Sequence, residues 1–210
     1  MDDASNPGTN NAGTNLPQDI QNIAAEKGLS DFDHRNRFVA SFLYQLPFWK
    51  GSEGWIHAAF ADWQAGGIYT LESGSPFTVN LSVDRANNGE PLSAPSQRPD
   101  LTCDPNRGPK TTTQWFNPTC FQLPAQYTYG SAGRDIVIGP GTNDFDATFQ
   151  KNFSLRENMQ VQFRADMFDF FNQPNFNQPN RIFTATPSAF GSISSALDPR
   201  ILQFSLRFAF

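Results

Sequence analysis

Apolar and polar residues alternate along several segments of the chain, and this period of two predicts β-strands with one apolar and one polar face. The most regular segment begins at Asn158, and every second residue from Met159 to Met167 is apolar. Its polar row, which we expect to face a lumen, comprises Asn158, Gln160, Gln162, Arg164 and Asp166. Comparable alternation begins at three other places, Arg37, Asp144 and Leu202.

A fifth run, from Trp55 to Glu72, is predicted to be a strand, although the assignment of its faces is ambiguous. Within it, Gly66 and Gly67 predict a bulge or a bend. All these segments are long enough for the roughly 9 to 11 tilted residues with which a strand crosses a bilayer. Most strands of soluble proteins have only about 5 or 6 residues. The lengths therefore favour transmembrane strands.

The connections between these segments alternate between long and short. The long ones cover residues 1–35, 73–143 and 172–199, and the short ones cover residues 48–54 and 154–157. Outer-membrane barrels have the same asymmetry, with short periplasmic turns and long extracellular loops. The pattern predicts an all-β fold: an antiparallel transmembrane β-barrel segment of about five long strands, which is an incomplete barrel. Residues 1–35 are expected to form an irregular extracellular loop or terminus, and residues 36–210 the barrel segment.

Composition and charge exclude some classes of protein and some kinds of partner. Charged residues make up 17% of the chain and mean hydropathy is −0.49, yet Phe occurs 21 times. No run approaches the roughly 20 apolar residues that a membrane-spanning helix needs, whereas alternating barrel strands keep mean hydropathy low. The net charge is −5 and basic residues are scattered singly, so nucleic acid is not an expected partner. The first residues lack the regions of a secretory signal, and we expect an export signal upstream.

Aromatic residues gather near the predicted strand ends, where they fit the interfacial girdles of a barrel, although a soluble core would use them too. They are Tyr44, Phe48, Trp49, Trp55, Phe153, Phe168, Phe170, Phe171 and Phe210. Lys151 interrupts an apolar row close to a short turn, and we expect its ammonium to reach the membrane interface. The long loop carries further aromatic residues that fit either ligand contact or packing of the loop: Trp115, Phe116, Phe121, Tyr127 and Tyr129.

Cys103 and Cys120 lie in a stretch rich in Pro, Asn and Thr. In an oxidising compartment we expect them to form a disulfide, and two free thiols in a cytosolic protein are the alternative.

Motifs for catalysis or for metal and cofactor binding are weak. The two histidines are His34 and His57, and no triad or zinc spacing accompanies them. Residues 139–141 lack the third glycine of a dinucleotide loop, and a calcium-like run from Asp104 ends on Trp115 where a glutamate is needed. Paired carboxylates, the basis of a hydrolase hypothesis, are Asp144 with Asp146 and Asp166 with Asp169. We expect no enzyme activity, no cofactor and no metal.

Several motifs resemble TonB-dependent outer-membrane transporters, and within them the Oar-like group. The longest are D-F-D-x-x-F-x-K-N-F from Asp144, F-R-A-D-M-F-x-F-F-N-Q-P-N-F from Phe163 and D-P-R-x-x-Q-F-x-x-R-F-x-F from Asp198. Shorter ones are W-Q-x-G-G-I from Trp63, S-G-S-P-F-T-V from Ser73 and F-G-x-I from Phe190. The resemblance covers roughly residues 31–210.

The resemblance implies a location in the bacterial outer membrane and a role in uptake or as a receptor. It also implies that the outer-membrane assembly machinery reads the aromatic C-terminal strand, here Phe208 and Phe210. A complete member has an N-terminal plug, a TonB-contacting segment and about 22 strands. We therefore expect this chain to be the C-terminal part of a longer transporter, or the product of a truncated reading frame, and to transport nothing alone. Its expected partners are outer-membrane lipid, the rest of the barrel and the plug, with TonB reached only through the missing parts.

Two other hypotheses come from different classes of protein. One is a secreted β-rich binding or adhesion module that uses the loop of residues 73–143. The other is a hydrolase built on the paired carboxylates, which would need a concave site and a carboxyl group with a raised pKa.

Overall fold

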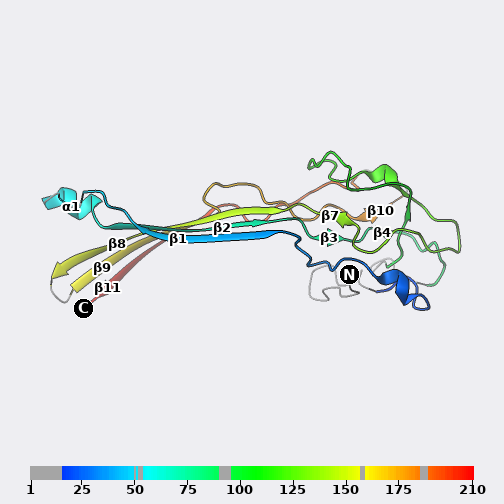
Figure 1. Ribbon diagram of the computed structural model, residues 1–210, viewed down its shortest axis with the longest axis horizontal. Coiled ribbons are helices and arrows are strands. Elements are labelled where there is room, and N and C mark those ends of the chain that lie inside the picture. The colour runs from blue at the N-terminus through cyan, green and yellow to red at the C-terminus, as the bar shows by residue number, and fades with distance from the viewer. Residues whose placement is uncertain (1–15, 50, 52–53, 90–95, 157–158, 185–188) are drawn as a thin grey trace. The chain divides into compact units, whose positions relative to one another are not determined.

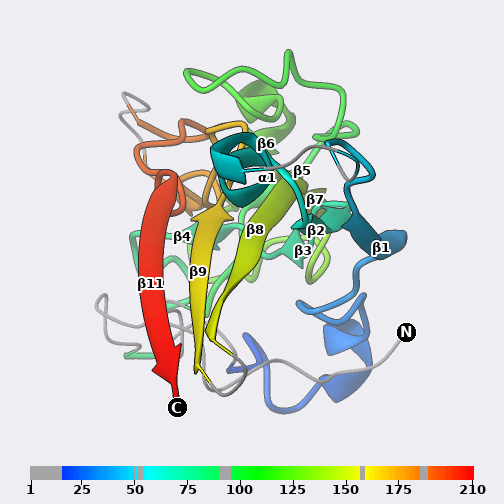
Figure 2. The same cartoon turned by 90° about the vertical axis from the view of Figure 1, so that its left-hand side faces the viewer.

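Five long strands form an antiparallel sheet in the computed structural model of the chain. The structure describes residues 16–49, 51, 54–89, 96–156, 159–184 and 189–210. The strands are β1 (Arg37–Gln45), β2 (Trp63–Glu72), β8 (Thr142–Arg156), β9 (Met159–Phe168) and β11 (Ile201–Ala209). They pair in the order β1-β2-β8-β9-β11, and Figure 2 shows β11, β9 and β8 side by side. Among the described residues β1 and β11 each pair on one side only, so the sheet is open.

The chain divides into two compact units. The sheet unit comprises Asn36–Glu72, Thr142–Asn175 and Leu197–Phe210. The loop unit comprises the described residues up to Arg35, together with Ser73–Gly141 and Phe176–Ala196. The loop unit therefore combines three segments that the sequence pattern assigned to a terminus and to separate long loops. These two units divide the chain differently from the single boundary expected at residue 36.

The strand registers bring the apolar rows of the five strands onto one face of the sheet, because directly paired residues share a face. One row is apolar and contains Phe42, Gly67, Ala147, Met167 and Leu202. A row on the opposite face is polar and contains Gln45, Gln64, Gln150, Arg164 and Ser205. The period of two along each strand thus becomes an apolar face and a polar face of the sheet. The predicted all-β, antiparallel and unclosed fold is confirmed.

The connection between β1 and β2 differs from the prediction. Residues 46–62 form it, and it contains a short helix, α1 (Gly54–Phe60), so the strand begins at Trp63 and not at Trp55 (Figure 1). Among the described residues, no helix is long and apolar enough to cross a membrane.

The predicted bulge at Gly66 and Gly67 is wrong, because both glycines pair in unbroken register with β1 and β8. A Cβ atom on Gly67 would lie within 2.9 Å of the rings of Phe42 and Phe145. These two rings stack with centroids 6.3 Å apart on either side of the glycine. The missing side chain makes room for aromatic packing across three strands, and the backbone stays regular. A register shift occurs instead between Ser154 and Arg156, where β8 ends.

The loop unit has a core of its own although its strands are very short. They are β3 (Pro76–Phe77), β4 (Asn80–Leu81), β5 (Asp100–Leu101), β6 (Phe121–Gln122), β7 (Val137–Ile138) and β10 (Ile182–Phe183). Strand β3 pairs with β7, β5 with β6, and β4 with β10. The described part of the loop unit also contains two 3-10 turns, Ile23–Glu26 and Pro118–Cys120. The buried cluster comprises Phe77, Val79, Phe116, Phe121, Ala132, Val137 and Phe190. The rings of Phe116 and Phe190 pack against each other with their centroids 5.0 Å apart.

Covalent and ionic contacts hold distant segments of the loop unit together. A disulfide joins Cys103 to Cys120, the pair expected from the sequence, with Cα atoms 4.9 Å apart. Glu26 and Arg98 form a bidentate ion pair, with nitrogen to oxygen distances of 2.7 and 3.0 Å. Each of these side chains is only 3% exposed. The segment before Arg35, expected to be irregular, is thereby attached to residues far along the chain.

Candidate functional site: the two faces of the sheet

The apolar face of the sheet consists of every second side chain of the five long strands. Its members include Phe38, Phe42, Tyr69, Phe145, Phe149, Val161, Phe163, Phe204, Leu206 and Phe208. Many are well exposed, and the side chain of Phe204 in the middle of β11 is 63% exposed. Large exposed apolar patches on proteins mark contact with a membrane or another protein.

Aromatic rings form clusters at both ends of this face. The loop end of the sheet is where β1 begins and β2 ends, and the turn end is the opposite one. At the loop end, the ring of Phe145 contacts those of Tyr69, Phe170 and Phe171 at 5.4 to 6.4 Å. At the turn end, Trp63 contacts Phe163 at 6.1 Å. Of the aromatic residues proposed from the sequence as a girdle, Phe168 lies on the polar face, because it pairs with Ile201 one position beyond the apolar Met167–Leu202 pair.

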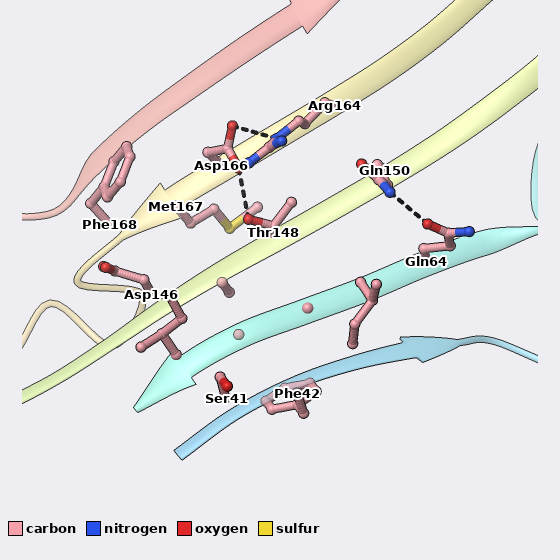
Figure 3. Close-up of a pocket in the computed structure, with 15 residues that line it drawn as sticks. Ser41, Phe42, Gln64, Asp146, Thr148, Gln150, Arg164, Asp166, Met167 and Phe168 are labelled. Carbon is pink, nitrogen blue, oxygen red and sulfur yellow. Dashed lines mark hydrogen bonds and ion pairs between the residues drawn. The ribbon is translucent and has the colours of Figure 1, made fainter. Parts of the chain in front are cut away.

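The polar face contains a hollow of about 650 Å³, lined mainly by side chains of that face (Figure 3). The Arg164 guanidinium donates to both oxygens of Asp166 at 2.9 Å, and the Thr148 hydroxyl donates to Asp166 at 2.7 Å. Beside them, the Gln150 amide donates to Gln64 of the neighbouring strand. Side chains of three strands therefore form a hydrogen-bonded surface.

Where the structure describes the predicted polar row, its residues share one face of the strand, and their position toward a lumen stays a prediction. Gln160, Gln162, Arg164 and Asp166 share one face of β9, and Asn158 lies outside the described residues. The sequence pattern missed the matching row of β2, which includes Gln64 and Glu72, because alternation around the glycine pair is weak. Their pairing partners on β8 and β1 would have identified the face.

Two ion pairs lie on the polar face. Arg37 forms an ion pair with Glu72 at 2.6 Å, and Arg164 forms one with Asp166. Among the described residues, no group of three or more potential ligands is arranged to hold a metal ion. Chemically, this face suits contact with water or with a polar protein surface.

Comparison with protein families identifies the setting of these two faces. The model of the outer membrane beta barrel domain matches residues 1–203. The chain belongs to this family. It is a β-barrel domain of the bacterial outer membrane, and in such barrels the apolar face of the strands contacts lipid while the polar face lines the interior. No curated protein and no solved structure matches the chain.

Lys151 stands on the lipid-facing side of this outer-membrane barrel sheet, and the structure corrects its expected position. Its side chain is 3% exposed and its ammonium does not reach the surface. The ammonium donates instead to the backbone carbonyls of His57 and Ala61, at the C-terminal end of α1. The helix therefore covers the one charge that the apolar row contains.

The other residues noted in the sequence are placed as follows in the structure: some hold or fill the loop unit, and others are exposed. The Asn106 side chain binds the backbone of Ile136 and Ile138, so the calcium-like run serves to hold the loop unit. Phe116 and Phe121 of the long loop are buried in its core, whereas Tyr127 is exposed. Phe208 lies on the lipid face opposite Val161, and Phe210 follows β11 with its side chain fully exposed.

Proposed function

We propose that the chain forms the C-terminal barrel wall of a TonB-dependent outer-membrane transporter of the Oar-like group. The observation that supports this most is the placement of the three longest motifs. They fall on β8, β9 and β11, which are neighbours in the sheet, and each contributes side chains to both faces. The motif residues thus belong to one continuous piece of wall.

The open edges of the sheet indicate what else the transporter needs. In lipid, each unpaired backbone group costs several kcal/mol, so membrane strands occur in closed barrels. We propose that further strands pair with β1 and β11, and that a plug and a TonB-contacting segment belong to the same transporter. Energy coupling would come from those parts, and the present strands act as pore wall without catalysis.

In this proposal the turn end of the sheet lies at the periplasm and the loop end faces the exterior. The two connections at the turn end are the shorter ones, as is usual in bacterial outer-membrane barrels. Phe208 and Phe210 then lie at the periplasmic side, where the outer-membrane assembly machinery would read them. The loop unit would lie outside the cell, which agrees with its disulfide.

Translation of the DNA upstream of Met1, in frame, tests this proposal. Further alternating strands, a plug domain and a signal peptide would support it. An in-frame stop codon that follows an unrelated gene would contradict it, because no plug or TonB-contacting segment would then be encoded with these strands.

A second candidate is a secreted binding module, which the separate core of the loop unit favours. Solubility distinguishes the two functions. The secreted module would purify as a monomer without detergent, whereas the transporter wall requires detergent because of its exposed phenylalanine rows.

A further inference from the structure

The position of α1 follows from the side chains that bind its C-terminal end. Trp63 and Lys151 are paired residues of the lipid face. The Trp63 indole donates to the carbonyl of Ala59 at 3.0 Å, and the Lys151 ammonium donates to the carbonyls of His57 and Ala61. Because both donors point out of the lipid face, α1 lies on the lipid side of the sheet and not on the lumen side.

These hydrogen bonds satisfy two groups that lipid cannot solvate. The last carbonyls of a helix carry partial negative charge. The His57 carbonyl already accepts from the Ala61 N–H at 3.0 Å, and the Lys151 ammonium adds a second, charged donor to it. The carbonyls of Ala59 and Ala61 accept from the Trp63 and Lys151 side chains. A lysine on the lipid face of a barrel strand is unfavourable unless its charge is compensated. Each group is the partner of the other here. A short helix at this place is thus compatible with a position beside lipid.

The connection that contains α1 also exposes a cluster of aromatic residues. We call its described residues, 46–49, 51 and 54–62, the aromatic turn. The Trp49 ring contacts Phe48 at 5.7 Å and Phe60 at 5.5 Å. The Trp55 side chain is 74% exposed. Polar groups of the turn include His57 and Asp62, whose side chains lie 3.4 Å apart. Tryptophan residues, whose rings are amphipathic, are enriched where membrane proteins meet the membrane–water interface.

We propose that the aromatic turn is a lipid anchor that lies at the boundary between headgroups and acyl chains, and that Lys151 holds it there. Its occupant is phospholipid, because the turn is continuous with the lipid face through Trp63 and Lys151. The inference rests on membership of the outer-membrane barrel family, so it does not depend on the transporter proposal.

Fluorescence quenching of Trp55 tests the anchor in the full-length protein, purified from outer membranes and reconstituted in phospholipid vesicles. The background carries Trp49→Phe and Trp115→Phe but keeps Trp63, so that its hydrogen bond to α1 survives. Subtracting the signal of the same protein with Trp55→Phe isolates the Trp55 emission. The probes are aqueous iodide and phospholipids brominated at either end of the acyl chain.

The anchor predicts blue-shifted Trp55 emission, strong quenching by lipid brominated near the carbonyl end, weaker quenching by lipid brominated near the methyl end, and weak quenching by iodide. Strong iodide quenching without lipid quenching would overturn the proposal, since the turn would then lie in water. Protection from both probes would overturn it too, because a second copy or another part of the barrel would then cover the turn.

Two substitutions at Lys151 test its part in the anchor. Lys151→Met keeps an unbranched apolar stem but removes the donor, and we expect lipid quenching of Trp55 to fall and iodide quenching to rise. Lys151→Arg keeps a cationic donor and should retain the wild-type quenching pattern. Unchanged quenching in Lys151→Met, with the protein still inserted, would overturn the holding role.

Discussion

The buried pair of Glu26 and Arg98 gives a quantitative test of how the loop unit is held together. Glu26 lies in the first 3-10 turn and binds both terminal nitrogens of Arg98, while the backbone N–H of Gln18 donates to the same carboxylate at 3.2 Å. Water is excluded from the pair, since each side chain is only 3% exposed. The substitution Glu26→Gln keeps the shape of the side chain but leaves the guanidinium charge without a counter-charge.

Removing one partner of a buried ion pair costs about 3–5 kcal/mol. At about 1.4 kcal/mol for each factor of ten, the fraction of molecules with this part of the loop unit open should rise by roughly two to three and a half powers of ten. The matched control is Arg107→Gln, which breaks the exposed pair with Asp104 at 3.3 Å. We expect no measurable change in the control, because exposed ion pairs add little to stability.

Hydrogen exchange measured by mass spectrometry on the membrane-inserted protein provides the assay, with peptides of β8 and β9 as internal reference. Faster exchange should be confined to the loop unit. Replacing both partners together, Glu26→Leu with Arg98→Met, should recover most of the protection, since an apolar pair leaves no buried charge. Equal exchange in Glu26→Gln and Arg107→Gln would refute the reasoning.

Three further predictions concern other parts of the molecule. Phe204→Arg should weaken membrane insertion by about 2–4 kcal/mol, as for a charge at mid-depth on the lipid face of a barrel. The control Gln203→Arg changes the neighbouring residue, which pairs with Asp166 on the polar face, and this variant should insert normally. Urea titration in vesicles compares the two variants, and an equal loss of stability in both would contradict the assignment of faces. Replacing Cys103 and Cys120 by Ser should destabilise the loop unit by roughly 3 kcal/mol, on the chain-entropy model for a loop of this length. The loss should appear as faster proteolysis between residues 103 and 120. Unchanged proteolysis would contradict this prediction. Burial raises the pKa of Asp135, although the Thr78 hydroxyl and Arg134 oppose the shift. The folded loop unit therefore binds the proton of this carboxyl group more tightly than the unfolded chain does. The stability that the protonated group contributes at acid pH is lost as pH rises through its raised pKa. Asp135→Asn should flatten that part of the pH profile of loop-unit hydrogen exchange, after correction for intrinsic rates, and an identical profile in wild type and variant would be inconsistent with it.

The long strands could be predicted from the sequence because their pattern is local. Along β9, Met159 to Met167 alternate with polar residues, and lipid on one side and a polar interior on the other preserve this period without help from distant residues. The glycine pair of β2 hid the same pattern. Gly67 leaves a gap that rings of two other strands fill, and a single strand does not reveal that contact.

Helix α1 and the loop unit could not be predicted because distant residues hold them. The helix is short, and its last carbonyls depend on Lys151, which lies about ninety residues away along the chain. Similarly, Phe77, Phe116 and Phe190 meet in one core from segments with neither helical nor strand periodicity. Pro and Gly around them suggested loops, and only the tertiary contacts make these segments a folded unit.

The most direct test of the account is the environment of successive side chains along β9. Nitroxide labels on single introduced cysteines report collision with oxygen, which concentrates in lipid, and with a nickel chelate, which stays in water. We predict a period of two in the outer membrane, with labels at Val161 and Phe163 accessible to oxygen and labels at Gln160 and Gln162 accessible to nickel. Accessibility without this alternation, or with the two sets exchanged, would contradict the claim that the apolar face of the sheet contacts lipid and the polar face lines the barrel.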